Sequence, residues 1–126
     1  MTYATDQSEF MRAGGQTVEG FNAHQAERYV KHIAEEASET YEAFTAGDHV
    51  KTIDGAVDTI VVALGLLWSY GVNPDDAWRA VHAANMRKLV DGKPYIRPDG
   101  QIGKPPGWIG PEDELAKLIE PWMRGE

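Results

Sequence analysis

Two groups of acidic residues stand where they could bind a cation. Glu35, Glu36 and Glu39 form one group, and Asp54 and Asp58 form the other. At about 100° per residue, Glu36 and Glu39 lie on one flank of a helical apolar stripe, and Asp54 and Asp58 on one flank of the next. Two antiparallel helices packed through those stripes would gather these carboxylates. Because crowded carboxylates demand a counter-ion, the pattern predicts a hard divalent cation, Mg²⁺ or Mn²⁺.

The alternative is a solvated acidic helix face. Exposed charge is the ordinary state of glutamate on a helix, so a lone Glu-Glu-x-x-Glu run favours that interpretation. Aspartate is a poor residue in the middle of a helix, yet Asp54 and Asp58 both fall inside a strongly apolar helical stretch. The two groups together therefore favour a cation site.

The elements that position these residues are predicted to be helices, so the fold class is all-α. Apolar residues recur every three or four positions, and Gly47 and Asp48 separate the two acidic stretches as helix end and N-cap. Asn73 and Pro74 begin a further helix. Helices are expected over about residues 6–12, 22–46, 48–70 and 74–89, and from 111 onward.

Residues 90–110 contain five Gly and four Pro and cannot sustain a helix. We expect an ordered loop or lid there. The chain is predicted to be one domain over 1–126, with a helical bundle over about 20–90 and the lid and C-terminal helix over 91–126. The second acidic helix is apolar over too wide an arc for one partner helix, which predicts a homo-oligomer, a dimer or a tetramer.

Composition narrows the function. The 126 residues contain no cysteine, which excludes thiol catalysis and thiolate metal sites. A net charge of −8 repels phosphate backbones and anionic membranes, so neither nucleic acid nor a membrane is an expected partner. The longest apolar run, residues 60–68, is about half a membrane span, and the first fifteen residues lack an apolar signal segment. We expect a cytoplasmic protein.

Four motifs in order resemble a known superfamily. They are Glu35-Glu36-x-x-Glu39, then Asp54 to Asp58 ahead of an apolar run ending in Tyr70-Gly71, then Asn85-Met86-Arg87-Lys88, then the segment from Gly92 to Gly100. Over about residues 30–108 the chain resembles the all-α nucleoside triphosphate pyrophosphohydrolases. This superfamily includes MazG-like proteins, dimeric dUTPases and phosphoribosyl-ATP pyrophosphohydrolase. The resemblance implies a MazG-like helical bundle from a bacterial or phage-infected cell.

The resemblance also implies roles for the acidic residues. Glu36, Glu39 and Asp58 match metal ligands, and Glu35 matches a glutamate that helps to activate water. The usual second motif is Glu-x-x-Asp, which would place an acid where this chain has Gly55. Asp54 is expected to replace that acid, because residues four apart still share a helix face.

On the substrate side, Asn85 and Lys88 match an Asn-x-x-Lys element that contacts nucleotide sugar and phosphates in relatives. The remaining predicted substrate-binding residues are Lys31, Tyr95, Arg97, Lys104, Asn22 and His24. For Lys31 a solvated helix face is an equal alternative, and for Asn22 and His24 the alternative is helix capping or surface polarity. Trp108 could cover a base or anchor the C-terminal segment.

The implied reaction cleaves a (d)NTP between the α and β phosphates, giving (d)NMP and pyrophosphate, with two or three Mg²⁺ or Mn²⁺ ions per site. Acceptors in the N-terminal third favour a purine substrate such as dGTP or GTP. Three alternatives stay open: a catalytically weak nucleotide-binding regulator, a dUTP- or dCTP-directed hydrolase, and a phosphoribosyl-ATP hydrolase. A di-iron bundle is disfavoured, because no histidine has a glutamate three residues before it.

Overall fold

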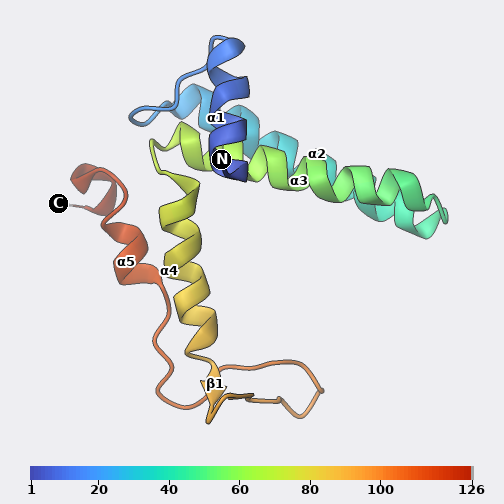
Figure 1. The fold of residues 1–126 in the computed structure, drawn as a ribbon, viewed down its shortest axis with the longest axis vertical. Helices are drawn as coiled ribbons and strands as arrows, with labels where there is room; N and C mark the ends of the chain where they lie inside the picture. The colour runs from blue at the N-terminus through green and yellow to red at the C-terminus, as the bar shows by residue number, and fades with distance from the viewer. Residues whose placement is uncertain (126) are drawn as a thin grey trace. The chain divides into compact units, whose positions relative to one another are not determined.

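The computed structural model describes residues 1–125 and is all-α apart from one small hairpin (Figure 1). In chain order the elements are α1 (Tyr3–Ala13), α2 (Ala23–Thr45), α3 (His49–Ser69), α4 (Pro74–Met86), β1 (Leu89–Val90), β2 (Lys93–Pro94), α5 (Glu112–Ala116) and the 3-10 helix η1 (Pro121–Arg124). The predicted fold class is thus confirmed. The chain divides into two compact units, Met1–Pro74 and Asp75–Glu126. The expectation of a single domain stays a prediction.

The N-terminal unit is built on an antiparallel hairpin of α2 and α3. Gly47 turns the chain at a φ of 73°, and the Asp48 side chain caps α3 by accepting from the Lys51 N–H at 3.0 Å. Two glycines of α3 allow the helices to approach closely. A Cβ on Gly55 would lie 2.3 Å from Thr40 Oγ1, and one on Gly65 would lie 2.2 Å from the Tyr29 ring. These two contacts fix which residues face each other along the hairpin.

The core of this unit lies at the base of the hairpin, where α1 packs on α3. Its buried residues are Met11, Val18 and Tyr29, and the Trp68 indole N–H donates to the Ala4 carbonyl at 2.9 Å. Gln25 is 2% exposed, and its amide nitrogen donates to both Thr17 O and Ser69 Oγ at 2.8 Å. A satisfied polar network therefore ties the start of α2 to the end of α3.

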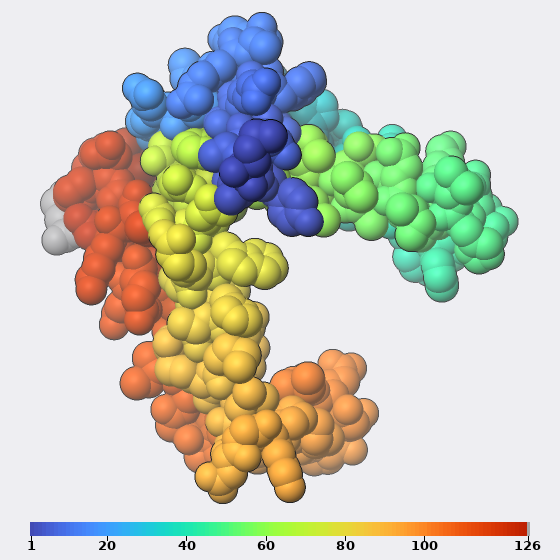
Figure 2. Space-filling model, viewed as in Figure 1, coloured from blue at the N-terminus to red at the C-terminus, as the bar shows by residue number. Residues whose placement is uncertain are grey.

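The outer half of the hairpin extends beyond α1 as two helices alone (Figures 1 and 2). Four apolar side chains of α3 are at least half exposed there: Val50, Ile53, Val57 and Ile60. Within residues 1–125 no single helix is long and apolar enough to cross a membrane, and only the broken pair of α3 and α4 passes on length and composition.

The C-terminal unit contains α4, the β1–β2 hairpin and the Gly/Pro-rich segment. Asp91 and Gly92 both have positive φ, 52° and 75°, which is the geometry of a two-residue hairpin turn. A second tight turn follows, closed by a bridge between Ile96 and Ile102. The segment predicted to be a loop is therefore ordered by two successive turns.

Two helix ends differ from the sequence prediction. The helix expected to reach residue 89 ends at Met86, because Leu89 and Val90 pair with Lys93 and Pro94 as strands. The last helix is also shorter than its amphipathic pattern suggested: α5 covers Glu112–Ala116, and a separate 3-10 turn begins at Pro121. Proline has no N–H to continue the helix, which is a physical reason for the break.

Candidate active site

The acidic residues of α2 and α3 meet beside the contact between Gly55 and Thr40. The Thr40 hydroxyl donates to the Glu36 carbonyl at 2.6 Å, so Thr40 stays in line with the turn that carries Glu36. Asp58 follows Gly55 by three residues and shares its face of α3. Glu36 and Asp58 are both partly buried, whereas Glu35, Glu39 and Asp54 are exposed.

The electrostatics of Glu36 report how close these carboxylates are. Partial burial raises the pKa of the Glu36 carboxyl above its ordinary value of 4.5, and four negative neighbours raise the pKa further. In order of effect, those neighbours are Asp58, Glu39, Asp54 and Glu35. The largest of the four effects comes from the opposite helix. The structure therefore places the other four acidic residues singled out from the sequence close enough to Glu36 to raise its pKa.

Position 55 explains the departure from the usual acidic motif. A side chain on Gly55 would run into Thr40, whose Cβ and Cα lie 3.2 and 3.3 Å from the ideal Cβ position. An acid at this position would therefore require Thr40 to shift. Asp54 lies one residue earlier, outside this close approach, and its charge still raises the pKa of Glu36. The chain thus keeps an acidic charge near Glu36 while the helices remain in close contact.

Glu35 and Lys31 each have a partner on their own helix. The Glu35 carboxylate lies 3.4 Å from His32 Nδ1, and Lys31 Nζ lies 3.4 Å from the Glu27 carboxylate. All four side chains are more than half exposed, so these pairs contribute little to stability. They do bias the directions in which the Glu35 and Lys31 side chains point.

The acidic group has the chemistry of a site for a hard cation, but its carboxylates do not point to one common position. Among residues 1–125, no three His, Asp or Glu side chains are close enough together to hold a metal ion as they stand. The donor set consists only of carboxylate oxygens, which hard divalent cations prefer. A cation would also offset the repulsion that raises the pKa of Glu36. Glu36, Glu39, Asp54 and Asp58 are the residues that could hold it.

Asn22 and His24 lie at the start of α2. The Asn22 side chain accepts from the Gln25 N–H at 3.0 Å as the helix N-cap, and its amide donates to Thr17 Oγ1 at 3.1 Å. The His24 side chain is exposed. Asn22 therefore has a structural role, and a role for either residue in binding a base stays a prediction.

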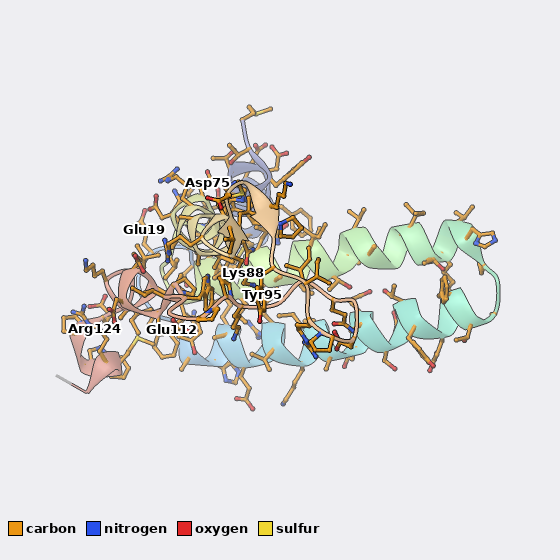
Figure 3. All side chains as sticks on the ribbon, turned by 90° about the horizontal axis from the view of Figure 1, so that it is seen from below. Glu19, Asp75, Lys88, Tyr95, Glu112 and Arg124 are labelled. Carbon is orange, nitrogen blue, oxygen red and sulfur yellow. The ribbon has the colours of Figure 1, made fainter. Side chains whose placement is uncertain are left out.

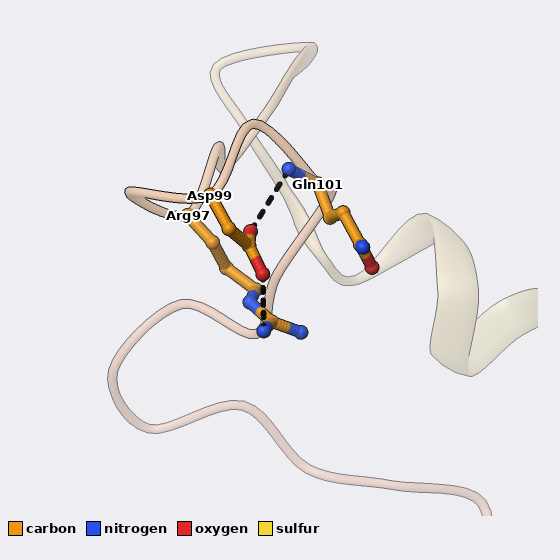
Figure 4. Close-up of polar contacts among 3 residues, drawn as sticks. All are labelled: Arg97, Asp99 and Gln101. Atoms are coloured by element: carbon orange, nitrogen blue, oxygen red, sulfur yellow. Dashed lines mark hydrogen bonds and ion pairs between the residues drawn. The ribbon is translucent and has the colours of Figure 1, made fainter.

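The other predicted substrate-binding residues belong to the C-terminal unit, where Figure 3 labels Lys88 and Tyr95. Lys88 Nζ and Lys104 Nζ lie 5.2 and 5.1 Å from the centre of the Trp108 ring. Arg97 instead pairs with Asp99 at 2.5 Å, within a turn where the other Asp99 oxygen accepts from the Gln101 N–H (Figure 4). Asn85 and Tyr95 are exposed. The structure thus brings Lys88 and Lys104 together and gives Arg97 an acidic partner.

Residues 10–85 match the family PRA-PH, phosphoribosyl-ATP pyrophosphohydrolase, well over half of the chain. The chain belongs to this family. Membership in PRA-PH agrees with the all-helical fold and with the superfamily inferred from the motifs, and it supports a nucleotide pyrophosphohydrolase activity at the general level. A search of curated proteins finds no match. The PRA-PH match includes every acidic residue of the site and ends before Lys88, Lys104 and Trp108.

Sequence reasoning missed the role of Arg87. Its guanidinium donates to the Ile109 carbonyl at 3.1 and 3.2 Å and to the Gly110 carbonyl at 3.2 Å, which fastens the Gly/Pro-rich segment to the end of α4. No spacing of residues in the sequence predicts a contact between residues more than twenty positions apart. The Asp91-Gly92 pair, in contrast, is a recognisable hairpin signal that could have located β1 and β2.

Proposed function

We propose that the protein is a metal-dependent (d)NTP pyrophosphohydrolase that cleaves between the α and β phosphates and releases (d)NMP and pyrophosphate. The observation that carries this proposal is the environment of Glu36, whose pKa is raised first by partial burial and then by four further carboxylates on α2 and α3. Repulsion makes such a group of carboxylates unfavourable without a counter-ion, and the same carboxylates can bind a cation. Mg²⁺, or Mn²⁺ in its place, would supply charge neutralisation of the triphosphate and a lowered pKa of the attacking water.

In this mechanism Glu36, Glu39, Asp54 and Asp58 are the residues that would hold two or three ions through their oxygens. Glu35 accepts the proton of the attacking water. Its carboxylate is exposed and lies near His32 Nδ1, so it is oriented without being neutralised by a lysine or arginine. The proton then leaves to solvent, and the bond between the α phosphorus and the bridging oxygen breaks as the new P–O bond forms.

Basic residues bind the leaving pyrophosphate. Lys88 and Lys104 are the strongest candidates, because both ammonium groups gather at one indole ring. Asn85 is proposed to contact the sugar. Tyr95 is proposed to contribute as it stands, and Lys31 and Arg97 after release from, or beside, Glu27 and Asp99. Asn22 and His24 are proposed to lie toward the base.

We favour a purine nucleotide, dGTP or GTP, as the substrate. The N–H donors of guanine need hydrogen-bond acceptors, and the N-terminal third of the chain contains polar side chains that could accept. dUTP, dCTP and phosphoribosyl-ATP are the competing substrates, and the family description names the last of these. Discrimination built on buried hydrogen bonds should be steep, about 10⁴-fold, whereas a pocket that only stacks the base should be permissive.

The test is a pyrophosphate-release assay with Mg²⁺ or Mn²⁺ across the eight common NTPs and dNTPs and phosphoribosyl-ATP, with an EDTA control. We expect turnover that EDTA abolishes and that is greatest with dGTP or GTP. A preference for a pyrimidine or for phosphoribosyl-ATP would overturn the purine assignment alone. Nucleotide binding without turnover under any condition would instead support the regulator alternative and contradict the proposed activity.

We also propose that the protein acts as a homodimer or as a tetramer of dimers. Val50, Ile53, Val57 and Ile60 are 52–82% exposed and spaced by three and four residues, which is the period of a helix-packing seam. Val57 follows Gly55 by two residues, about 200° around the helix, so this seam lies on the side of α3 away from α2. Packing against a second copy would cover it.

Light scattering tests the assembly. We expect wild type to be oligomeric at micromolar concentration and Ile53→Glu to shift it toward monomer, because a charge would be buried in the seam. Lys51→Glu, which alters charge on the same helix outside the seam, is the matched control. A monomeric wild type would refute the assembly. The proposed nucleotide substrate favours a cytoplasmic protein, and this location is part of the proposal.

A further inference from the structure

Trp108 holds two parts of the C-terminal unit together. Its indole N–H donates to the Ala84 carbonyl near the end of α4 at 2.8 Å, and its ring lies 5.2 Å from Lys88 Nζ and 5.1 Å from Lys104 Nζ. Both distances are within the range of about 6 Å in which an aromatic face attracts a cation. One residue therefore positions one lysine that follows α4 and another from the Gly/Pro-rich segment.

The surroundings of Trp108 are ordered on its C-terminal side as well. Arg87 donates to the carbonyls of Ile109 and Gly110, so the chain just after Trp108 is fastened to the end of α4. An open cavity of about 310 Å³ adjoins the indole and is lined by Arg87, Pro105, Pro106, Gly107, Trp108 and Ile109. The two prolines restrict the backbone beside the ring. Trp108 is thus a fixed platform with room next to it.

Among the described residues, no neighbouring carboxylate offsets the charge of either lysine at this platform. Elsewhere in the described part of the chain, Lys31, Arg79 and Arg97 each pair with a carboxylate, whereas other lysines such as Lys51 and Lys93 do not. Within residues 1–125, Lys88 and Lys104 have no carboxylate within ion-pair distance, although the protein carries a net charge of −8. Two ammonium groups gathered without a counter-charge form an attractive site for a multiply charged anion.

We infer that Trp108 is a positioning residue, which holds Lys88 and Lys104 so that both can bind phosphate groups of one polyphosphate. This inference rests on the proposed function and deepens it, because the anion is the part of the substrate that leaves as pyrophosphate. The π face orients the lysines while leaving their N–H groups unneutralised, and these can donate to phosphate oxygens. Trp108 lies outside the segment that matches the family.

The experiment is isothermal titration of the full chain with inorganic pyrophosphate, at low salt and in EDTA, so that neither metal nor turnover is required. Wild type should bind. Lys88→Gln and Lys104→Gln should each weaken binding about tenfold, since each removes one charged donor. Trp108→Leu should weaken binding about two- to fivefold per lysine through loss of the π face. Trp108→Phe, which keeps a π face and loses the indole N–H, should retain most of the affinity.

Two matched controls separate this role from general effects. Trp78→Leu removes an exposed tryptophan of α4, and Lys117→Gln removes a lysine of the same unit outside the site. Both should bind pyrophosphate like wild type. In the double background Lys88→Gln with Lys104→Gln, Trp108→Leu should have no further effect on affinity. In the hydrolysis assay, Trp108→Leu should raise KM and leave kcat within about twofold.

Three results would overturn the inference: a wild type that does not bind pyrophosphate, a Trp108→Leu variant that binds like wild type, or equal losses in Trp108→Leu and Trp108→Phe. The last would show that the hydrogen bond to Ala84, rather than the π face, sets the affinity. The proposed activity can fail separately. If wild type binds pyrophosphate through this platform but hydrolyses no nucleotide, the inference stands and the proposed function falls.

Discussion

Two regions of this protein each gather charges of one sign, but they do so by different physical means. On α2 and α3, carboxylates from two packed helices surround Glu36, and partial burial together with repulsion from these carboxylates raises its pKa. In the C-terminal unit, Lys88 and Lys104 lie against the π face of Trp108, which attracts each of them. We therefore expect an added cation to stabilise the acidic group, whereas the Trp108 ring already attracts each lysine of the basic group.

The largest expected effect is on the acidic side. Glu39→Gln and Asp58→Asn should each lower Mg²⁺-dependent hydrolysis by roughly 10³-fold or more, because each removes a charged metal ligand. Initial rates of pyrophosphate release measure the loss, and circular dichroism checks that the helices remain. Glu42→Gln, on the same helix but not among the charges that act on Glu36, is the control. Unchanged turnover in either variant would refute the site.

The packing that assembles the acidic group gives the second effect. Gly65→Ala should lower the free energy of unfolding by about 1–3 kcal/mol, since the new methyl would overlap the buried Tyr29 ring. Gly55→Ala should cost less, because its closest neighbour is the rotatable Thr40 hydroxyl, and Thr40→Ala should relieve part of that cost. Urea denaturation measures all three. Equal losses at the two glycines would contradict the packing described.

The smallest effect tests the comparison most directly. The pKa of Glu36 is higher in the folded protein than its unfolded value of 4.5. The stability that protonated Glu36 supplies is therefore fully present below pH 4.5, and it is lost as the pH rises through the raised pKa. In EDTA at pH 7, Glu36→Gln should therefore melt above wild type and show less loss of stability with rising pH. Mg²⁺ should raise the melting temperature of wild type more than that of the variant.

Lys104→Gln provides the contrast on the basic side. Removing a lysine from the Trp108 face should lower stability slightly, by under about 1 kcal/mol, instead of raising it. Thermal melts of the two variants under the same conditions give the comparison. If Glu36→Gln lowered stability in EDTA, or Lys104→Gln raised it, the two regions would not differ in the way described.

The acidic region was largely predictable from sequence. Its helices follow from apolar spacing, and Gly47 and Asp48 set the observed boundary between Thr45 and His49. Helical periodicity alone places Glu36 and Asp58 on neighbouring flanks. What the sequence left open was the reason for Gly55, because a close approach between helices is visible only when both are packed.

The basic region was predictable in its residues but not in its arrangement. The sequence predicts that Lys88 and Lys104 bind substrate, and that role stays a prediction, whereas their meeting at Trp108 depends on how the Gly/Pro-rich segment folds back along α4. Such contacts between distant segments follow no helical or strand periodicity, so the sequence does not predict them. The last helix was overestimated for a related reason, since amphipathic spacing continued to residue 122 while Pro121 broke the backbone pattern.

The buried Gln25 network has a mechanical consequence for the hairpin. Gln25 binds Thr17 and Ser69, and Ser69 in turn donates to Gly65, so the base of the hairpin is clamped while its tip carries only two helices. Local opening is easiest where few buried contacts resist it. The helices α2 and α3 should therefore separate more easily at the tip of the hairpin than at its base. The acidic residues lie between base and tip, where a small change in the distance between the two helices can bring their carboxylates together without disturbing the core.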